Sequence, residues 1–136
     1  MLTRDQILVA SASRLRHETV DVPELGGEIM LWEMTGAERN AFDAVVSHIG
    51  KDPALEATWR TQLLVRSIKD AEGVPLFAAA DLDRLGAALP GPVMVRLWDR
   101  AARLSAVTVE DVEDLRKNSV SGPGGGSASG SPNVSG

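Results

Sequence analysis

The sequence predicts a mainly α-helical fold with a small N-terminal β-hairpin, of the α+β class, followed by a disordered C-terminal tail. Three observations predict this. Apolar residues recur at helical spacing through most of the chain. Two alternating segments flank a Gly-Gly pair near the N-terminus, which is typical of a hairpin. The charged residues all precede position 118, so we expect a compact helical domain over residues 1–117 and a tail over 118–136.

The expected tail is polar and uncharged. Its 19 residues include six Gly, six Ser and two Pro. Such a segment buries too little apolar surface to offset the entropy lost when a chain becomes ordered, so we expect it to be flexible. An expression linker over 122–130 is the alternative interpretation of the same composition.

Composition excludes several classes of partner. The 136 residues suit one domain, and 14 basic against 19 acidic side chains give a net charge of −5 with both signs intermixed. Nucleic acids and anionic membrane surfaces attract clustered basic residues, which are absent from this sequence. The chain has no Cys, hence no disulfide or thiolate metal site. It also shows no signal peptide layout and no apolar run of roughly 18 residues, so we expect a soluble protein that stays in the cell.

The hairpin is expected over about residues 18–34. Val20 and Val22 alternate with polar residues, which is the period of a half-buried strand. Gly26 and Gly27 supply the turn, because glycine tolerates a positive φ. A second apolar run, up to residue 34, completes the pair of strands. Because an isolated hairpin is only marginally stable in water, we expect it to pack on the helices.

Helix starts are marked by capping residues. Thr35 and Glu38 have the spacing of a capping box, Thr3 and Gln6 repeat it at the N-terminus, and Thr108 suits an N-cap. Glycine and proline separate most of the segments that follow. The helices expected from these signals and from apolar periodicity span about residues 4–13, 36–49, 53–69, 79–89, 92–105 and 109–117.

The sequence shows no catalytic, cofactor-binding or metal site. His48 and Asp52 are four residues apart, but Gly and Pro interrupt the helix that would bring them together, and a solvent-facing His at a helix end is the simpler interpretation. His17 stands alone. The glycine run at 124–126 follows no strand and opens no helix, so it is not a phosphate loop. Four carboxylates near the C-terminus are interpreted as a solvated helix face: Glu110, Asp111, Glu113 and Asp114.

The second strand of the hairpin carries the candidate partner-binding residues. Successive side chains point to opposite faces of a strand, so Ile29 and Leu31 face one way and Met30, Trp32 and Met34 face the other. Both faces are therefore apolar. Either the strand is covered on both sides, or the face with Met30, Trp32 and Met34 is left for a partner, because Trp and Met are favoured at interfaces.

These motifs together resemble the tail assembly chaperones of long-tailed, siphovirus-type phages and prophages. The resemblance covers about residues 1–120. It is carried by a V-x-V-P-E-x-G-G strand-turn-strand, a T-G-x-E-R helix start with a following Phe, and closing helices with a K-N-S stop. In this sequence those motifs stand at residues 20–28, at 33–39 with Phe42, at 81–82, 97–98 and 101–104, and at 109–119.

The resemblance implies a function and partners. Such chaperones coat the long, helical tape measure protein and keep it soluble before the tail tube polymerises around it. The family further implies action in the host bacterial cytoplasm, absence from the mature virion, and a product of programmed frameshifting whose extension recruits tail tube protein. The tail of this chain would then be either the end of the product made without frameshifting or a linker to that extension. None of these roles requires catalysis or a cofactor.

One departure from the family pattern concerns the second strand. Polar or basic residues are expected between its alternating apolar positions, but Met30 and Trp32 stand there. This favours self-association or a partner contact at that face. Two other interpretations remain open: a structural virion component such as a head–tail connector or minor tail protein, and a small enzyme that uses His17 or His48.

Overall fold

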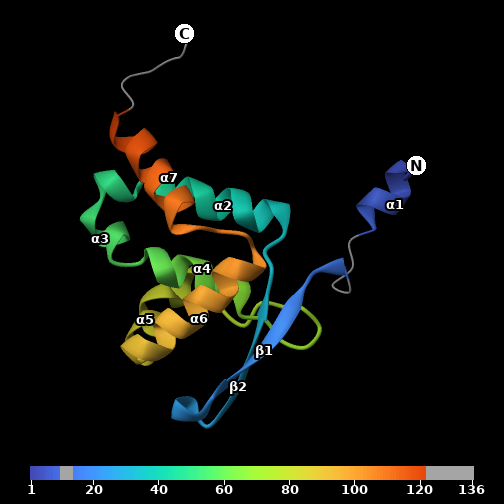
Figure 1. Ribbon diagram of the computed structural model, residues 1–136, viewed down its shortest axis with the longest axis horizontal. Coiled ribbons are helices and arrows are strands. Elements are labelled where there is room, and N and C mark those ends of the chain that lie inside the picture. The colour runs from blue at the N-terminus through green and yellow to red at the C-terminus, as the bar shows by residue number, and fades with distance from the viewer. Residues whose placement is uncertain (10–13, 122–136) are drawn as a thin grey trace.

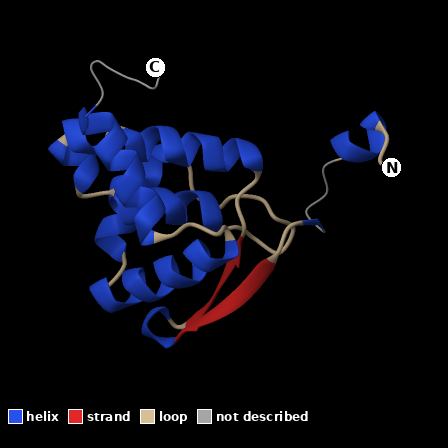
Figure 2. Ribbon diagram, turned by 45° about the horizontal axis from the view of Figure 1, so that its top comes forward, coloured by secondary structure: helices blue, strands red, loops and turns tan. Residues whose placement is uncertain are grey.

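The computed structural model describes residues 1–9 and 14–121, and it shows the predicted mainly α fold with an N-terminal antiparallel hairpin. Helices gather on one side of the hairpin, and α1 stands apart from them near the N-terminus (Figures 1 and 2). The predicted tail from residue 122 onward, like residues 10–13 of the first predicted helix, lies outside the described residues.

Eleven further elements follow α1 (Arg4–Leu8) within the described part of the chain. In chain order they are β1 (His17–Val22), η2 (Pro23–Leu25), β2 (Gly27–Trp32), α2 (Gly36–Ser47), η3 (Ile49–Lys51), α3 (Pro53–Glu56), α4 (Trp59–Ser67), η4 (Ala79–Asp81), α5 (Leu82–Ala88), α6 (Gly91–Leu104) and α7 (Val109–Ser121), where η marks a 3-10 turn.

The hairpin forms as its alternation and turn residues predict. β1 and β2 pair antiparallel in a register that sets Val20 opposite Ile29 and His17 opposite Trp32. A 3-10 turn joins them and ends at Gly26, whose φ of +81° is the left-handed conformation that glycine adopts without steric cost. One face of the hairpin packs on α6, so that Val20 and Val22 are buried.

Both predicted capping boxes are confirmed. The Thr3 hydroxyl accepts the Gln6 N–H while the Gln6 side chain accepts the Thr3 N–H, and Thr35 and Glu38 make the same exchange at the start of α2. α2 ends at Ser47, and the last residues of the predicted helix 36–49 instead enter the turn η3. Capping signals therefore located helix starts more accurately than apolar periodicity located helix ends.

The prediction of one helix over 53–69 is wrong. Residues 57–58 form a turn that separates α3 from α4, with Thr58 at a non-helical φ of −117°. Neither Gly nor Pro marks this break, so periodicity alone runs across it. The helix also ends at Ser67, because the next two residues pair with β2: Ile68 bridges Leu31, and the Lys69 N–H donates to the Met30 carbonyl at 3.2 Å.

The remaining helices differ from expectation mainly at their ends. The predicted helix 79–89 begins as the turn η4 and continues as α5, and α6 lies within one residue of the predicted 92–105. α7 continues four residues beyond the expected end at 117, because nothing in 118–121 stops a helix. Of the described helices, none is long and apolar enough to cross a membrane.

The core lies between the hairpin and the helices. α4 packs on α6, α2 packs on α7, and α6 also contacts both strands. Fully buried side chains come from every layer and include Leu31, Phe42, Leu63, Leu64 and Leu97. Burial of this apolar surface provides most of the driving force for the fold.

Candidate functional site

The second face of β2 is largely covered. Trp32 is only 3% exposed and Met34 8%, whereas Met30 is half-buried. The expected exposed face of Met30, Trp32 and Met34 is therefore not what the structure presents, because the strand is covered on both sides. Periodicity could not show this, since the cover comes from distant parts of the chain. Contact of these residues with a partner stays a prediction, and Met30 retains most of the accessible surface for it.

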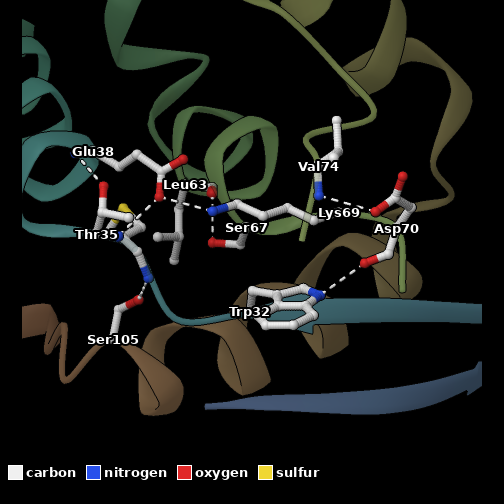
Figure 3. Close-up of polar contacts among 10 residues, drawn as sticks. Trp32, Thr35, Glu38, Leu63, Ser67, Lys69, Asp70, Val74 and Ser105 are labelled. Carbon is white, nitrogen blue, oxygen red and sulfur yellow. Dashed lines mark hydrogen bonds and ion pairs between the residues drawn. The ribbon is translucent and has the colours of Figure 1, made fainter. Parts of the chain in front are cut away.

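Trp32 is held by two specific contacts. Its indole N–H donates to the carbonyl oxygen of Asp70 at 3.1 Å (Figure 3). The ring of His17 stacks on the indole at a centroid distance of 4.3 Å. A buried Trp that satisfies its N–H and stacks on a neighbour is an anchor of the fold. The loop after α4, which carries Asp70, is thereby tied to the hairpin.

A buried polar cluster ties the same loop to α2. Lys69 is 4% exposed, and its ammonium lies 2.9 Å from Oε1 of Glu38, the residue that also completes the capping box with Thr35 (Figure 3). Burial lowers the pKa of the neighbouring Arg66, and the charge of Glu38 opposes that shift. Sequence reasoning missed Lys69, because a surface lysine and a buried one look alike in sequence.

The two histidines lie on different elements, and in the described part of the chain neither belongs to a group of potential metal ligands. His17 stacks on Trp32, and Nδ1 of His48 lies 2.7 Å from the Ala44 carbonyl oxygen at the end of α2. Among the described residues, no three His, Cys, Asp or Glu side chains gather as a metal site would require.

The C-terminal carboxylates act as local ion-pair partners. Asp111 completes a capping exchange with Thr108 and lies 3.8 Å from Arg39, while Glu113 lies 3.7 Å from Arg116. Glu110 and Asp114 are exposed. This is the solvated helix face that the sequence indicated.

A mostly apolar hollow lies between the hairpin turn, the loop after α4, and α5. We call it the hairpin groove, and its volume is about 590 Å³. This volume falls within the usual size range of ligand pockets. It is lined by Leu25, Ile29, Ile68, Leu76, Phe77, Asp81, Arg84, Leu85, Ala88 and Leu89.

The walls of the hairpin groove are fixed by polar contacts just outside it. The Leu76 N–H donates to the Ile68 carbonyl at 3.3 Å, which continues the pairing of Pro75 with Lys69 next to the bridge from Ile68 to β2. On the other side, Arg96 makes two hydrogen bonds to Glu24, at 2.8 and 3.1 Å, next to Leu25. The Arg96 hydrogen bond lowers the pKa of Glu24 below its ordinary 4.5. Leu25 and Leu76 nevertheless remain 49% and 58% exposed, so two leucines stand at the lips of the groove.

A second hollow, of about 490 Å³, lies beside α4 and is more polar. Trp59 lines it and packs edge-on against Trp98 at 5.2 Å, and the Arg60 guanidinium lies 4.7 Å above the Trp59 ring. Met94 and Asp83 complete its rim. Polar and apolar groups contribute about equally to its exposed lining, whereas the lining of the hairpin groove is mostly apolar.

The comparisons with known proteins agree with this architecture. A family model described as phage tail assembly chaperone matches residues 3–118. The solved structure of the bacteriophage HK97 tail assembly chaperone is similar in fold, with a TM-score of 0.55 and 25% sequence identity. That similarity covers 74% of this chain and 94% of the HK97 chain. No curated protein matches significantly.

Proposed function

Because this chain belongs to the phage tail assembly chaperone family, we propose that it binds the tape measure protein during tail morphogenesis and keeps it soluble. In this proposal the chain acts in the host bacterial cytoplasm and leaves before the virion is complete. A longer product of programmed frameshifting, which departs from this one in the C-terminal tail, recruits tail tube protein.

The hairpin groove is the observation that carries the proposal. A long helical client exposes apolar stripes before its partners assemble around it, and a chaperone must cover those stripes reversibly. An open apolar groove suits an amphipathic helix, whose residues at i, i+3, i+4 and i+7 anchor along it. Asp81 and Arg84 on the groove give it one charge of each sign, which suits the mixed polar face of such a helix. Many copies on one long client would add avidity.

Met30 is proposed as a second contact with the same client. Its side chain is half-buried, and its strand partner Thr19 is exposed, so this part of the hairpin offers a small apolar patch outside the groove. Substitution of Met30 by Asp is expected to weaken binding without unfolding the domain.

Co-expression with fragments of the tape measure protein tests the proposal. The wild-type chain should co-purify with helical fragments and reduce the light scattering that those fragments cause alone. Leu76→Asp places a charge at the lip of the groove, on a residue exposed enough to leave the fold intact, and should lose both effects. Val109→Asp, at an exposed position on α7, is the matched control and should behave as wild type.

Two results would contradict the proposal. If Leu76→Asp and Val109→Asp bind equally well, the groove is not the client site. If mass spectrometry finds the chain in purified virions in stoichiometric amount, it is a structural component and not an assembly factor. Mass spectrometry of infected cells also tests for the extended product, whose peptides would continue in a second reading frame.

A further inference from the structure

The charged side chains of the hairpin groove all lie on one of its three walls. Among the described residues, the hairpin wall and the loop wall contribute only apolar side chains: Leu25, Ile29, Ile68, Leu76 and Phe77. The third wall is formed by η4 and α5, and it carries Asp81 and Arg84. A helix lying in the groove therefore meets apolar side chains on two sides and charged groups on the third.

The short helix α5 distributes its charges between two hollows. Asp83 lines the second hollow, beside α4, whereas its neighbour Arg84 lines the hairpin groove. Successive residues of an α-helix point about 100° apart, so the same helix can present an acid to one hollow and a base to the other. The cation thus belongs to the groove, and the nearest acid in sequence is turned toward the other hollow.

Arg84 has no partner in the described part of the chain. Every other described arginine makes an ion pair, a hydrogen bond or a stacking contact with an aromatic ring. The side chain of Arg84 is exposed and makes none of these contacts. It is also the third residue of α5, and the dipole of a helix disfavours a cation in the first turn. Neither pairing nor helix stability therefore accounts for an arginine at this position.

The acids around the groove are already engaged. Oδ2 of Asp81 accepts the Ala78 N–H at 2.8 Å, a local exchange that holds the carboxylate at the start of η4. Just outside the groove, Glu24 and Arg96 neutralise each other. The charge that remains available to a bound molecule is the guanidinium of Arg84, although the whole chain has a net charge of −5.

We propose that Arg84 makes the hairpin groove selective for amphipathic helices that carry Asp or Glu beside their apolar stripe. This inference rests on the proposed function, because it names the class of client helix that the groove accepts. The apolar stripe lies against the hairpin and loop walls, and a carboxylate on the edge that faces α5 pairs with the planar guanidinium. A helix with Lys or Arg on that edge sets like charges together and binds less tightly. The ion pair also fixes the rotation of the client helix in the groove.

Three synthetic helical peptides test the proposal. They share one stripe of leucines at i, i+3, i+4 and i+7, and they carry Glu, Gln or Lys along both edges of that stripe. Fluorescence anisotropy at low salt compares their affinities for the full chain. The wild type should bind the Glu peptide about fivefold more tightly than the Gln peptide, and the Lys peptide least tightly. Non-specific attraction to a chain of net charge −5 favours the opposite order, so it cannot mimic this result.

Two charge reversals complete the experiment. Arg84→Glu should reverse the order, so that the Lys peptide binds most tightly. It should fold normally, because the position is exposed and an acid suits the first turn of a helix. Lys51→Glu is the matched control, since it changes the net charge equally at an exposed position outside the groove, and it should keep the wild-type order.

The outcomes separate this inference from the proposed function. Equal affinities of the three peptides for the wild type, or an unchanged order with Arg84→Glu, would overturn the charge selectivity and leave tape measure binding standing. A wild-type chain that binds none of the peptides, because a second copy or its own residues fill the groove, would overturn the selectivity and the groove as client site together.

Discussion

The ammonium of Lys69 lies 2.9 Å from Oε1 of Glu38, and that same oxygen accepts the backbone N–H of Thr35 at 2.8 Å. One carboxylate thus caps α2 and neutralises a cation that is 4% exposed. The two partners are 31 residues apart, and their contact holds the loop after α4 against the start of α2. That loop continues into Leu76 and Phe77 on one wall of the hairpin groove, so the buried pair positions the candidate site.

Glu38→Gln should destabilise the domain. The amide preserves an acceptor for the cap but leaves Lys69 buried without a countercharge, and it removes the carboxylate that favours the charged form of Arg66. Breaking a buried pair in this way costs up to about 3–5 kcal/mol, and the partial exposure of Glu38 puts the expected loss at the lower end. Urea denaturation measures it. Adding Lys69→Met should restore part of the loss; equal stability of Glu38→Gln and wild type would show that the pair contributes little.

Trp32→Ala should reduce the free energy of unfolding by about 3–5 kcal/mol, because it empties a buried site and removes the hydrogen bond to Asp70. Met30→Ala, on the same strand at a half-buried position, is the control and should cost clearly less. Urea denaturation of wild type and variant, followed by near-ultraviolet circular dichroism, measures this difference. A Trp32→Ala chain that keeps full stability but loses partner binding would instead make Trp32 a surface contact.

The carboxyl of Glu24 should titrate below 4.5, because its hydrogen bond to Arg96 favours the charged form. Folding lowers this pKa, so the pair stabilises the domain at any pH above the ordinary pKa of the carboxyl. That contribution is lost as the pH falls through the lower pKa of the folded state. Carboxyl carbon chemical shifts followed by NMR against pH test this directly. Arg96→Met should return the midpoint toward 4.5, and an unchanged midpoint would rule out Arg96 as the cause. Both side chains are more than a third exposed, so the effect on stability should be small.

Local signals allowed much of the fold to be predicted. The capping boxes at Thr3 and Thr35 are present where expected, and the turn ending at Gly26 joins the two predicted strands. The break at residues 57–58 was not predictable in the same way, because no Gly or Pro marks it. The family resemblance was also predictable, because its motifs are contiguous segments around these same turns and caps.

The candidate site was less predictable, because its residues are far apart in the sequence. The hairpin groove combines residues 25 to 89, and Trp32 is bonded to the carbonyl of Asp70, 38 residues away. The sequence by itself determined the hairpin and most of the helix starts, because spacing and caps act within a few residues. Only the tertiary structure decided that Trp32 and Lys69 are buried and that Leu25 and Leu76 line the same groove, because burial depends on which distant segments pack together.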